Sequence, residues 1–151
     1  MEHREIEKKY LIKELPKNLD DYPFHLIEQA YLTVDPVIRV RKEDENYYIT
    51  YKGSGLLSRE EYNLPLTPQA YETLRNKAEG NIISKKRVLI PYKTYTIELD
   101  IFDPPFAPLI LAEVEFESEE DANSFTEPEW FSEDVTNDTN YHNSTMSRKT
   151  F

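Results

Sequence analysis

The sequence contains no cysteine, only three glycines and no long apolar segment. Without cysteine, neither a disulfide framework nor thiolate chemistry is possible. Without a long apolar segment, neither a signal peptide nor a membrane-spanning helix is expected. These absences predict a cytoplasmic protein that does not enter membranes.

Positive charge is also scarce, because 18 Lys and Arg stand against 29 Asp and Glu, for a formal net charge of -11. Nucleic acids and membrane surfaces are polyanionic and attract basic proteins, so neither is an expected partner. An anionic ligand would need a local basic site. The 151 residues fit a single domain, 1–151, that is long enough to bury a core. Aromatic residues make up 13% of the chain and include eleven tyrosines, which favours strands.

The order of apolar and turn residues predicts mainly antiparallel β-structure with a few helices, an α+β fold. Residues 14–32 contain Pro16 and Pro23 between apolar positions of helical spacing, and this pattern predicts a short helix and a loop. Thr67 and Pro68 open the clearest helix. The tail, 126–151, is mostly polar. The other expected elements are strands at 5–12, 58–66, 82–92, 94–102 and 109–118, a hairpin at 37–55 and a helix at 118–125.

Each predicted strand has one charged face and one largely apolar face, because alternate side chains point to opposite sides. Arg39 and Arg41, for example, share a face opposite Val40. A solvated sheet face is the ordinary explanation of such a pattern. Here, however, bases and acids are sorted onto different strands, whereas a wet face would mix them. A barrel of seven or eight strands, with helices outside and charges in its lumen, explains the sorting better.

The lumen groups indicate the ligand. Carboxylates without His or Cys partners are hard oxygen ligands, which suit Mg²⁺ or Mn²⁺. Converging Arg and Lys side chains suit phosphate. Together, these groups predict a site for a polyphosphate chain and a divalent metal.

The Glu5-x-Glu7-x-Lys9 stretch resembles the signature of the CYTH domain, the family of triphosphate tunnel metalloenzymes. The resemblance continues in order through Arg39-x-Arg41, Lys52, Arg59 with Glu61, Lys85-x-Arg87, Glu98-x-Asp100 and Glu113-x-Glu115. It implies a closed eight-stranded antiparallel tunnel with a charged lumen, which binds a triphosphate and Mg²⁺ or Mn²⁺ and hydrolyses a phosphoanhydride bond.

The same resemblance implies roles for individual residues. Glu5, Glu7 and Glu115 correspond to the metal-coordinating acids. Tyr31 and Lys85 are candidates to polarise the attacking water. The further lumen carboxylates, for a second metal or the water, are Glu61, Glu98, Asp100 and Glu113. The phosphate clamp consists of Lys9, Arg39, Arg41, Lys52, Arg59, Lys85 and Arg87.

Members of this family differ in substrate, and inorganic tripolyphosphate is the first expectation for a compact chain. Class IV adenylate cyclases carry a His-Phe pair upstream of their motif, which residues 1–4 lack, so a cyclase is the second reading. Hydrolysis of nucleoside or thiamine triphosphate, and a sensor that binds polyphosphate or a nucleotide without catalysis, are further alternatives. Either a monomer or a homodimer is compatible with the sequence.

Overall fold

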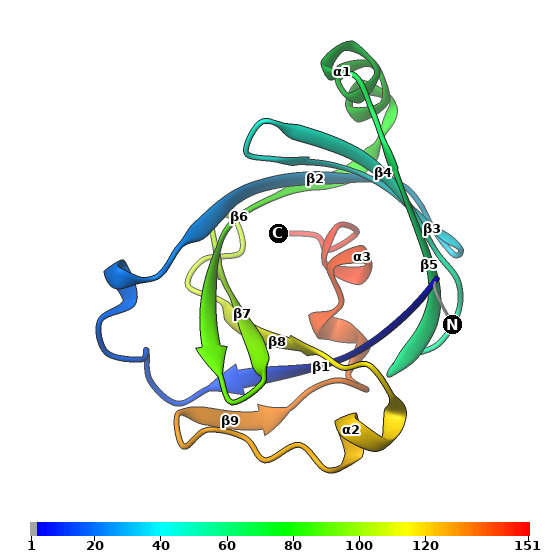
Figure 1. Ribbon diagram of the computed structural model, residues 1–151. Coiled ribbons are helices and arrows are strands. Elements are labelled where there is room, and N and C mark those ends of the chain that lie inside the picture. The colour runs from blue at the N-terminus through cyan, green and yellow to red at the C-terminus, as the bar shows by residue number, and fades with distance from the viewer. Residues whose placement is uncertain (1–2) are drawn as a thin grey trace.

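A barrel of antiparallel strands dominates the computed structural model, which describes residues 3–151 (Figure 1). Its strands are β1 Arg4–Ile12, β2 Phe24–Val34, β3 Val37–Glu43, β4 Asn46–Lys52, β5 Ser58–Pro65, β6 Glu79–Tyr92, β7 Tyr95–Phe102, β8 Ile110–Glu115 and β9 Phe131–Asp134. The order in the sheet is β5-β4-β3-β2-β6-β7-β8-β1-β9, and β1 also pairs with β5. This last pairing closes eight of the strands into the predicted tunnel.

The barrel closes at β1 because this strand changes partners along its length. Arg4, Glu5 and Ile6 pair with β5, whereas residues 7–10 pair with β8. Further along, Tyr10 and Ile12 pair with β9, which lies outside the closed barrel. The acidic start of the chain therefore lies at the seam where β5 and β8 meet.

The first long helix forms where its capping residues predict it. Helix α1 spans Pro68–Lys77, and the side chain of Thr67 accepts a hydrogen bond from the amide of Ala70 at 3.1 Å. Tyr71 on α1 packs over Ala30 and Val40 on the outside of β2 and β3. Helix α2, Glu119–Asn123, also lies outside the barrel, as expected (Figure 1).

The prediction for residues 14–32 was wrong. Only Leu19–Asp21 is helical, a single 3-10 turn, and β2 occupies most of the remainder. In β2, Gln29 and Tyr31 pair with lumen positions of β3, while Ala30 on the other face packs beneath α1. Both faces are buried, so the strand shows no simple alternation of apolar and polar residues. The spacing of its apolar residues therefore resembled that of a helix.

The largest hydrophobic core lies on the outside of the barrel. It is formed by outward-facing residues of β1, β6, β7 and β8, covered by α2 and β9. Ile97, Leu99 and Val114 are completely buried there. The rings of Tyr10 and Phe131 pack against each other in the same cluster, with ring centroids 4.7 Å apart. The apolar faces of the strands thus stabilise the fold from outside, as the face assignment predicted.

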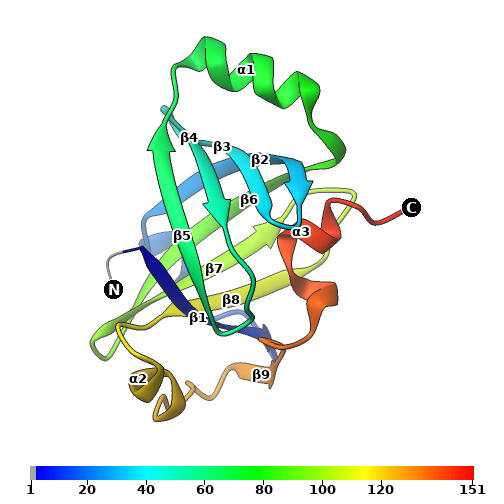
Figure 2. The ribbon, with the colours of Figure 1, turned by 90° about the vertical axis from the view of Figure 1, so that its right-hand side faces the viewer.

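The C-terminal tail returns to one end of the barrel and forms two short helices, η2 (Thr139–Tyr141) and α3 (Asn143–Met146). Figure 1, viewed along the barrel, shows α3 within the ring of strands, and Figure 2 places it at one end. The sequence did not predict this helix. We call this the inner end of the tunnel.

Candidate active site

A cavity of about 220 Å³ occupies the lumen, and charged side chains from seven strands line it. Of the predicted site residues, only Lys85 and Asp100 do not reach this cavity. Those that line it are Glu5, Glu7, Lys9, Tyr31, Arg39, Arg41, Lys52, Arg59, Glu61, Arg87, Glu98, Glu113 and Glu115. The cavity therefore brings together acids and bases that are far apart in the sequence.

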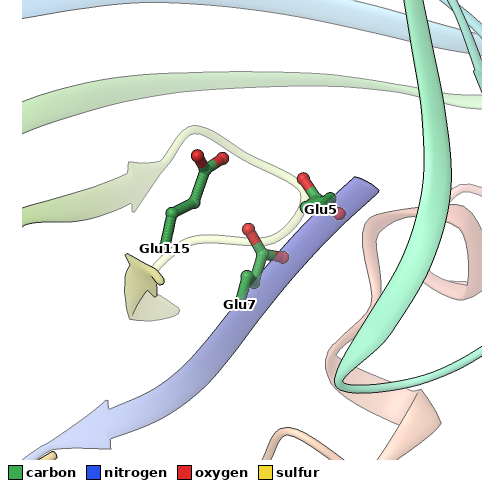
Figure 3. Close-up of side chains that lie close together, drawn as sticks. All are labelled: Glu5, Glu7 and Glu115. Atoms are coloured by element: carbon green, nitrogen blue, oxygen red, sulfur yellow. The ribbon is translucent and has the colours of Figure 1, made fainter. Parts of the chain in front are cut away.

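Three carboxylates on one wall of the cavity, formed by β1 and β8, converge. Oxygen atoms of Glu5, Glu7 and Glu115 lie within 4.8 Å of one another (Figure 3). Glu5 and Glu7 share the lumen face of β1, and Glu115 is the register partner of Glu7 on β8. Three oxygen donors from two adjacent strands are a donor set that a hard divalent cation prefers.

The electrostatics of these acids differ. Burial alone would raise the pKa of Glu5, but the charges of Lys52 and Arg59 outweigh it and lower this pKa to about 2. Lys52 Nζ lies 3.0 Å from Glu5 Oε1. Burial raises the pKa of Glu7, as do the charges of Glu113 and Glu5. Burial, followed by the charge of Glu98, likewise raises the pKa of Glu115 to about 7.

Among residues 3–151, Glu115 has no basic partner within ion-pair distance. A divalent cation between Glu5, Glu7 and Glu115 would supply the missing positive charge and remove their mutual repulsion. The donor set and its excess negative charge therefore fit a divalent metal.

The opposite wall is basic. Arg39 donates to Thr50 Oγ1 at 3.2 Å, and its buried Nε has no hydrogen-bond partner within the described chain. Two nitrogens of Arg41 donate to Gln29 Oε1 at 2.9 and 2.7 Å. Burial and the nearby charges of Arg39 and Arg87 lower the pKa of Arg41 to about 10. These two guanidinium groups repel each other, so an anion bound between them is stabilised.

Lys9, Lys52 and Arg59 are already engaged with acids or with the chain. Lys9 Nζ donates to the carbonyl oxygen of Tyr141 at 3.0 Å and lies 3.8 Å from Glu113. Lys52 also approaches Glu61 at 3.5 Å. Both lysines line the cavity and can contact a phosphate bound there.

Lys85, Arg87 and Asp100 form a separate buried network. Lys85 Nζ lies 2.7 Å from Asp100 Oδ2, and both side chains are fully buried. Arg87 donates to both oxygens of Asp100, at 2.8 and 2.9 Å. Burial, and then the charge of Arg87, lowers the pKa of Lys85 to about 8 although Asp100 opposes the shift. In this arrangement Lys85 and Asp100 hold one another, and Arg87 is oriented toward the cavity.

Sequence reasoning missed five residues of the cavity, namely Val37, Glu43, Asn63, Asn143 and Ser144. Glu43 lies two residues beyond Arg41, so the alternation that identified the arginines could have found it. Asn143 and Ser144 belong to the polar tail, which has no strand periodicity to place them.

Known proteins resemble this chain over nearly its whole length. The CYTH domain family model matches residues 3–150. The chain belongs to the CYTH family. A protein of Nitrosomonas europaea named inorganic triphosphatase is 37% identical over 150 residues, covering 95% of this chain and 96% of the relative. An inorganic triphosphatase of Acetivibrio thermocellus is 31% identical, covering 98% of this chain and 96% of the relative.

A solved structure agrees with these relatives. The crystal structure of an inorganic triphosphatase superposes with a TM-score of 0.72 at 32% identity, covering 97% of this chain and 95% of the other. The CYTH resemblance and the closed eight-stranded barrel predicted from the sequence are confirmed. No helix in residues 3–151 is long and apolar enough to cross a membrane.

Proposed function

We propose that this protein is a divalent-metal-dependent inorganic triphosphatase, which hydrolyses tripolyphosphate to diphosphate and phosphate. The observation that carries the proposal is a single cavity in which the Glu5, Glu7 and Glu115 carboxylates converge and which the Arg39 and Arg41 guanidinium groups also line. Relatives at 37% and 31% identity are named for this activity. A polyphosphate chain needs cations on both sides, and this cavity offers arginines on one wall and a metal site on the other.

The residues divide the work by position. Arg39 and Arg41 bind non-bridging phosphate oxygens, with Arg59 and Lys9 completing the clamp. Glu5, Glu7 and Glu115 hold Mg²⁺ or Mn²⁺, which supplies positive charge against the charge that develops on the phosphates. Positioning and electrostatics dominate phosphoryl transfer, and the walls of the cavity provide both.

Tyr31 is the better placed of the two residues proposed to polarise water. Its side chain lines the cavity, and its hydroxyl accepts a hydrogen bond from Gln29 Nε2 at 3.1 Å, which leaves its own proton free to donate. Lys85 instead donates to Asp100 and is fully buried. We therefore propose that Tyr31 polarises the attacking water and that Lys85, by pairing with Asp100, supports the barrel wall. Cytoplasmic location, the choice between Mg²⁺ and Mn²⁺, and a monomeric or homodimeric state belong to the same proposal.

Product analysis with Mg²⁺ and with Mn²⁺ tests this function. We expect phosphate release from tripolyphosphate, loss of that release in EDTA, and no cyclic AMP from ATP. Formation of cyclic AMP without hydrolysis of tripolyphosphate would instead establish the cyclase alternative. Tight binding of tripolyphosphate without turnover would establish the sensor alternative.

A further inference from the structure

Gln29 lies behind the basic wall of the cavity. Its side chain is completely buried and does not belong to the cavity lining, although it is polar. It is part of β2, where it is the register partner of Arg41 on β3. Tyr31, two residues further along β2, points to the same side of the strand and does line the cavity. A buried amide in this place needs a hydrogen-bond partner at each of its two ends.

The oxygen end of this amide holds Arg41. Arg41 donates to Gln29 Oε1 from Nε at 2.9 Å and from Nη2 at 2.7 Å. A guanidinium group has donors only, so the amide oxygen, and not the amide nitrogen, must face it. These two bonds occupy the Nε–Nη2 edge of Arg41. The Nη1–Nη2 edge is the one that can meet a phosphate in the cavity with two parallel hydrogen bonds.

The nitrogen end of the amide then has to face Tyr31. With Oε1 turned toward Arg41, Gln29 Nε2 donates to the hydroxyl oxygen of Tyr31 at 3.1 Å. Two hydrogens cannot share that line, so the hydroxyl hydrogen of Tyr31 points away from Gln29. Tyr31 lines the cavity, and its hydroxyl hydrogen is therefore available to a molecule bound there. Through the amide, Arg41 thus sets the direction of this hydrogen.

We propose that Gln29 is a positioning residue for hydrolysis, because its one buried amide fixes both the phosphate-binding edge of Arg41 and the direction of the Tyr31 hydroxyl hydrogen. The Tyr31 hydroxyl donates to the attacking water and holds it by one lone pair, so that the other lone pair can face the phosphorus atom. Arg41 binds a non-bridging oxygen of the same substrate. Gln29 itself touches neither. This inference rests on the proposed triphosphatase function.

Gln29→Glu tests the direction of the hydrogen, because it keeps the size and shape of the side chain. A carboxylate beside Arg41 stays ionised and still accepts from it, but has no hydrogen to donate to Tyr31. The Tyr31 hydroxyl then donates to the carboxylate, and its hydrogen is withdrawn from the cavity. We expect kcat for tripolyphosphate to fall at least about tenfold, although Arg41 keeps its partner.

A second background, Tyr31→Phe, separates positioning from a general disturbance of the site. Gln29→Glu is made both in the natural chain and in the Tyr31→Phe variant, and kcat is measured for all four proteins. Because the Tyr31→Phe variant has no hydroxyl to misdirect, the fall in kcat caused by Gln29→Glu should be at least about tenfold smaller there. A merely structural role would lower kcat by the same factor in both backgrounds. Two factors that differ by less than about tenfold therefore contradict the inference.

Gln29→Met keeps the inference testable if the Glu variant does not fold. It removes the donor to Tyr31 without adding a charge, so the hydroxyl hydrogen is no longer directed. The fall in kcat should then be at least about threefold larger in the natural chain than in the Tyr31→Phe variant, and a smaller difference contradicts the inference.

Glu28→Gln is the matched control for disturbance of β2. Glu28 is the neighbour of Gln29 along the strand, but its side chain binds Tyr71 and Arg75 outside the barrel. This substitution should leave kcat unchanged in both backgrounds.

Activity of the natural chain separates this inference from the proposed function. If the natural chain does not hydrolyse tripolyphosphate, the proposed function is wrong and the inference falls with it. If the natural chain is active and Gln29→Glu lowers kcat by the same factor in both backgrounds, only the inference is wrong.

Discussion

The two faces of the barrel wall do different work, although their residues alternate along the same strands. Ile97 on β7 is completely buried in the outer core, and its neighbour Glu98 lines the lumen cavity. Val114 and Glu113 on β8 repeat this relation. In most proteins the enclosed side is apolar, but here much of the stability comes from outside the barrel. Packing and chemistry can therefore be altered separately, by substituting adjacent residues.

Asp100 lies inside the barrel but stabilises the fold, so it is the clearest exception to this separation. Its substitution should have the largest effect on stability. Asp100→Ala leaves Lys85 and Arg87 buried without their shared carboxylate. We expect a loss of about 3–5 kcal/mol in the free energy of unfolding, because an unpaired buried charge is costly. Urea denaturation measures it. Glu98→Gln is the matched control. Glu98 comes no closer than 3.4 Å to Arg87, so its substitution should lower the free energy of unfolding much less.

Arg39→Ala should show the opposite behaviour. No acid within residues 3–151 forms an ion pair with Arg39, so its removal leaves no carboxylate unpaired. We expect kcat for tripolyphosphate to fall by about 10²–10³, the usual cost of one charge-stabilising donor. Lys42→Ala, on the outer face of β3, is the control and should keep full activity. Unfolding of the Arg39 variant would mean that the lumen arginines stabilise the fold.

Outer-face substitutions should reduce stability while the site stays intact. Ile97→Ala should cost about 2–5 kcal/mol, and Val114→Ala somewhat less because fewer methyl groups are lost. Denaturant midpoints measure both effects. At temperatures where the variants are folded, we expect kcat/KM for tripolyphosphate to remain near that of the natural chain. A tenfold loss of activity without a loss of stability would show that the two faces are coupled.

The smallest effect is expected at Glu28, on the outer face beneath α1. Burial raises its pKa, but hydrogen bonds from Tyr71 and Arg75 outweigh burial and lower it. A lowered pKa stabilises the fold above pH 4.5 and loses this contribution as the pH falls through the folded-state pKa. Glu28→Gln should therefore cost about 1 kcal/mol at neutral pH and progressively less in acid.

Thermal unfolding across the acid range checks this pH dependence. Glu72→Gln, exposed on α1, is the control and should show little change at any pH. A Glu28→Gln deficit that grows as the pH falls would contradict the assigned direction.

How much of this molecule could be predicted depended on alternation. Arg39, Glu98 and Glu113 were placed in the lumen because single-residue alternation is visible in their strands. Strand β2 was misread because α1 covers one face and the lumen the other, so both faces are buried. The packing of the C-terminal tail at the inner end of the tunnel could not be predicted for another reason. Tail residues, such as Met146, become buried only through contacts with distant strands, and no local pattern records such contacts.

Manganese binding to Glu115→Gln tests the central claim, the metal site, most directly. Glu115 is repelled by nearby carboxylates, and its pKa is raised to about 7. Above that pH and in EDTA, the variant should be at least as stable as the natural chain, because a repelled charge has been removed. Its Mn²⁺ affinity, measured by calorimetric titration, should nevertheless fall at least about tenfold. Glu117→Gln, two residues beyond Glu115 in the groove that Thr94 and Thr96 also line, is the control and should bind Mn²⁺ normally. Unchanged Mn²⁺ affinity and unchanged tripolyphosphate hydrolysis in Glu115→Gln would contradict the metal site.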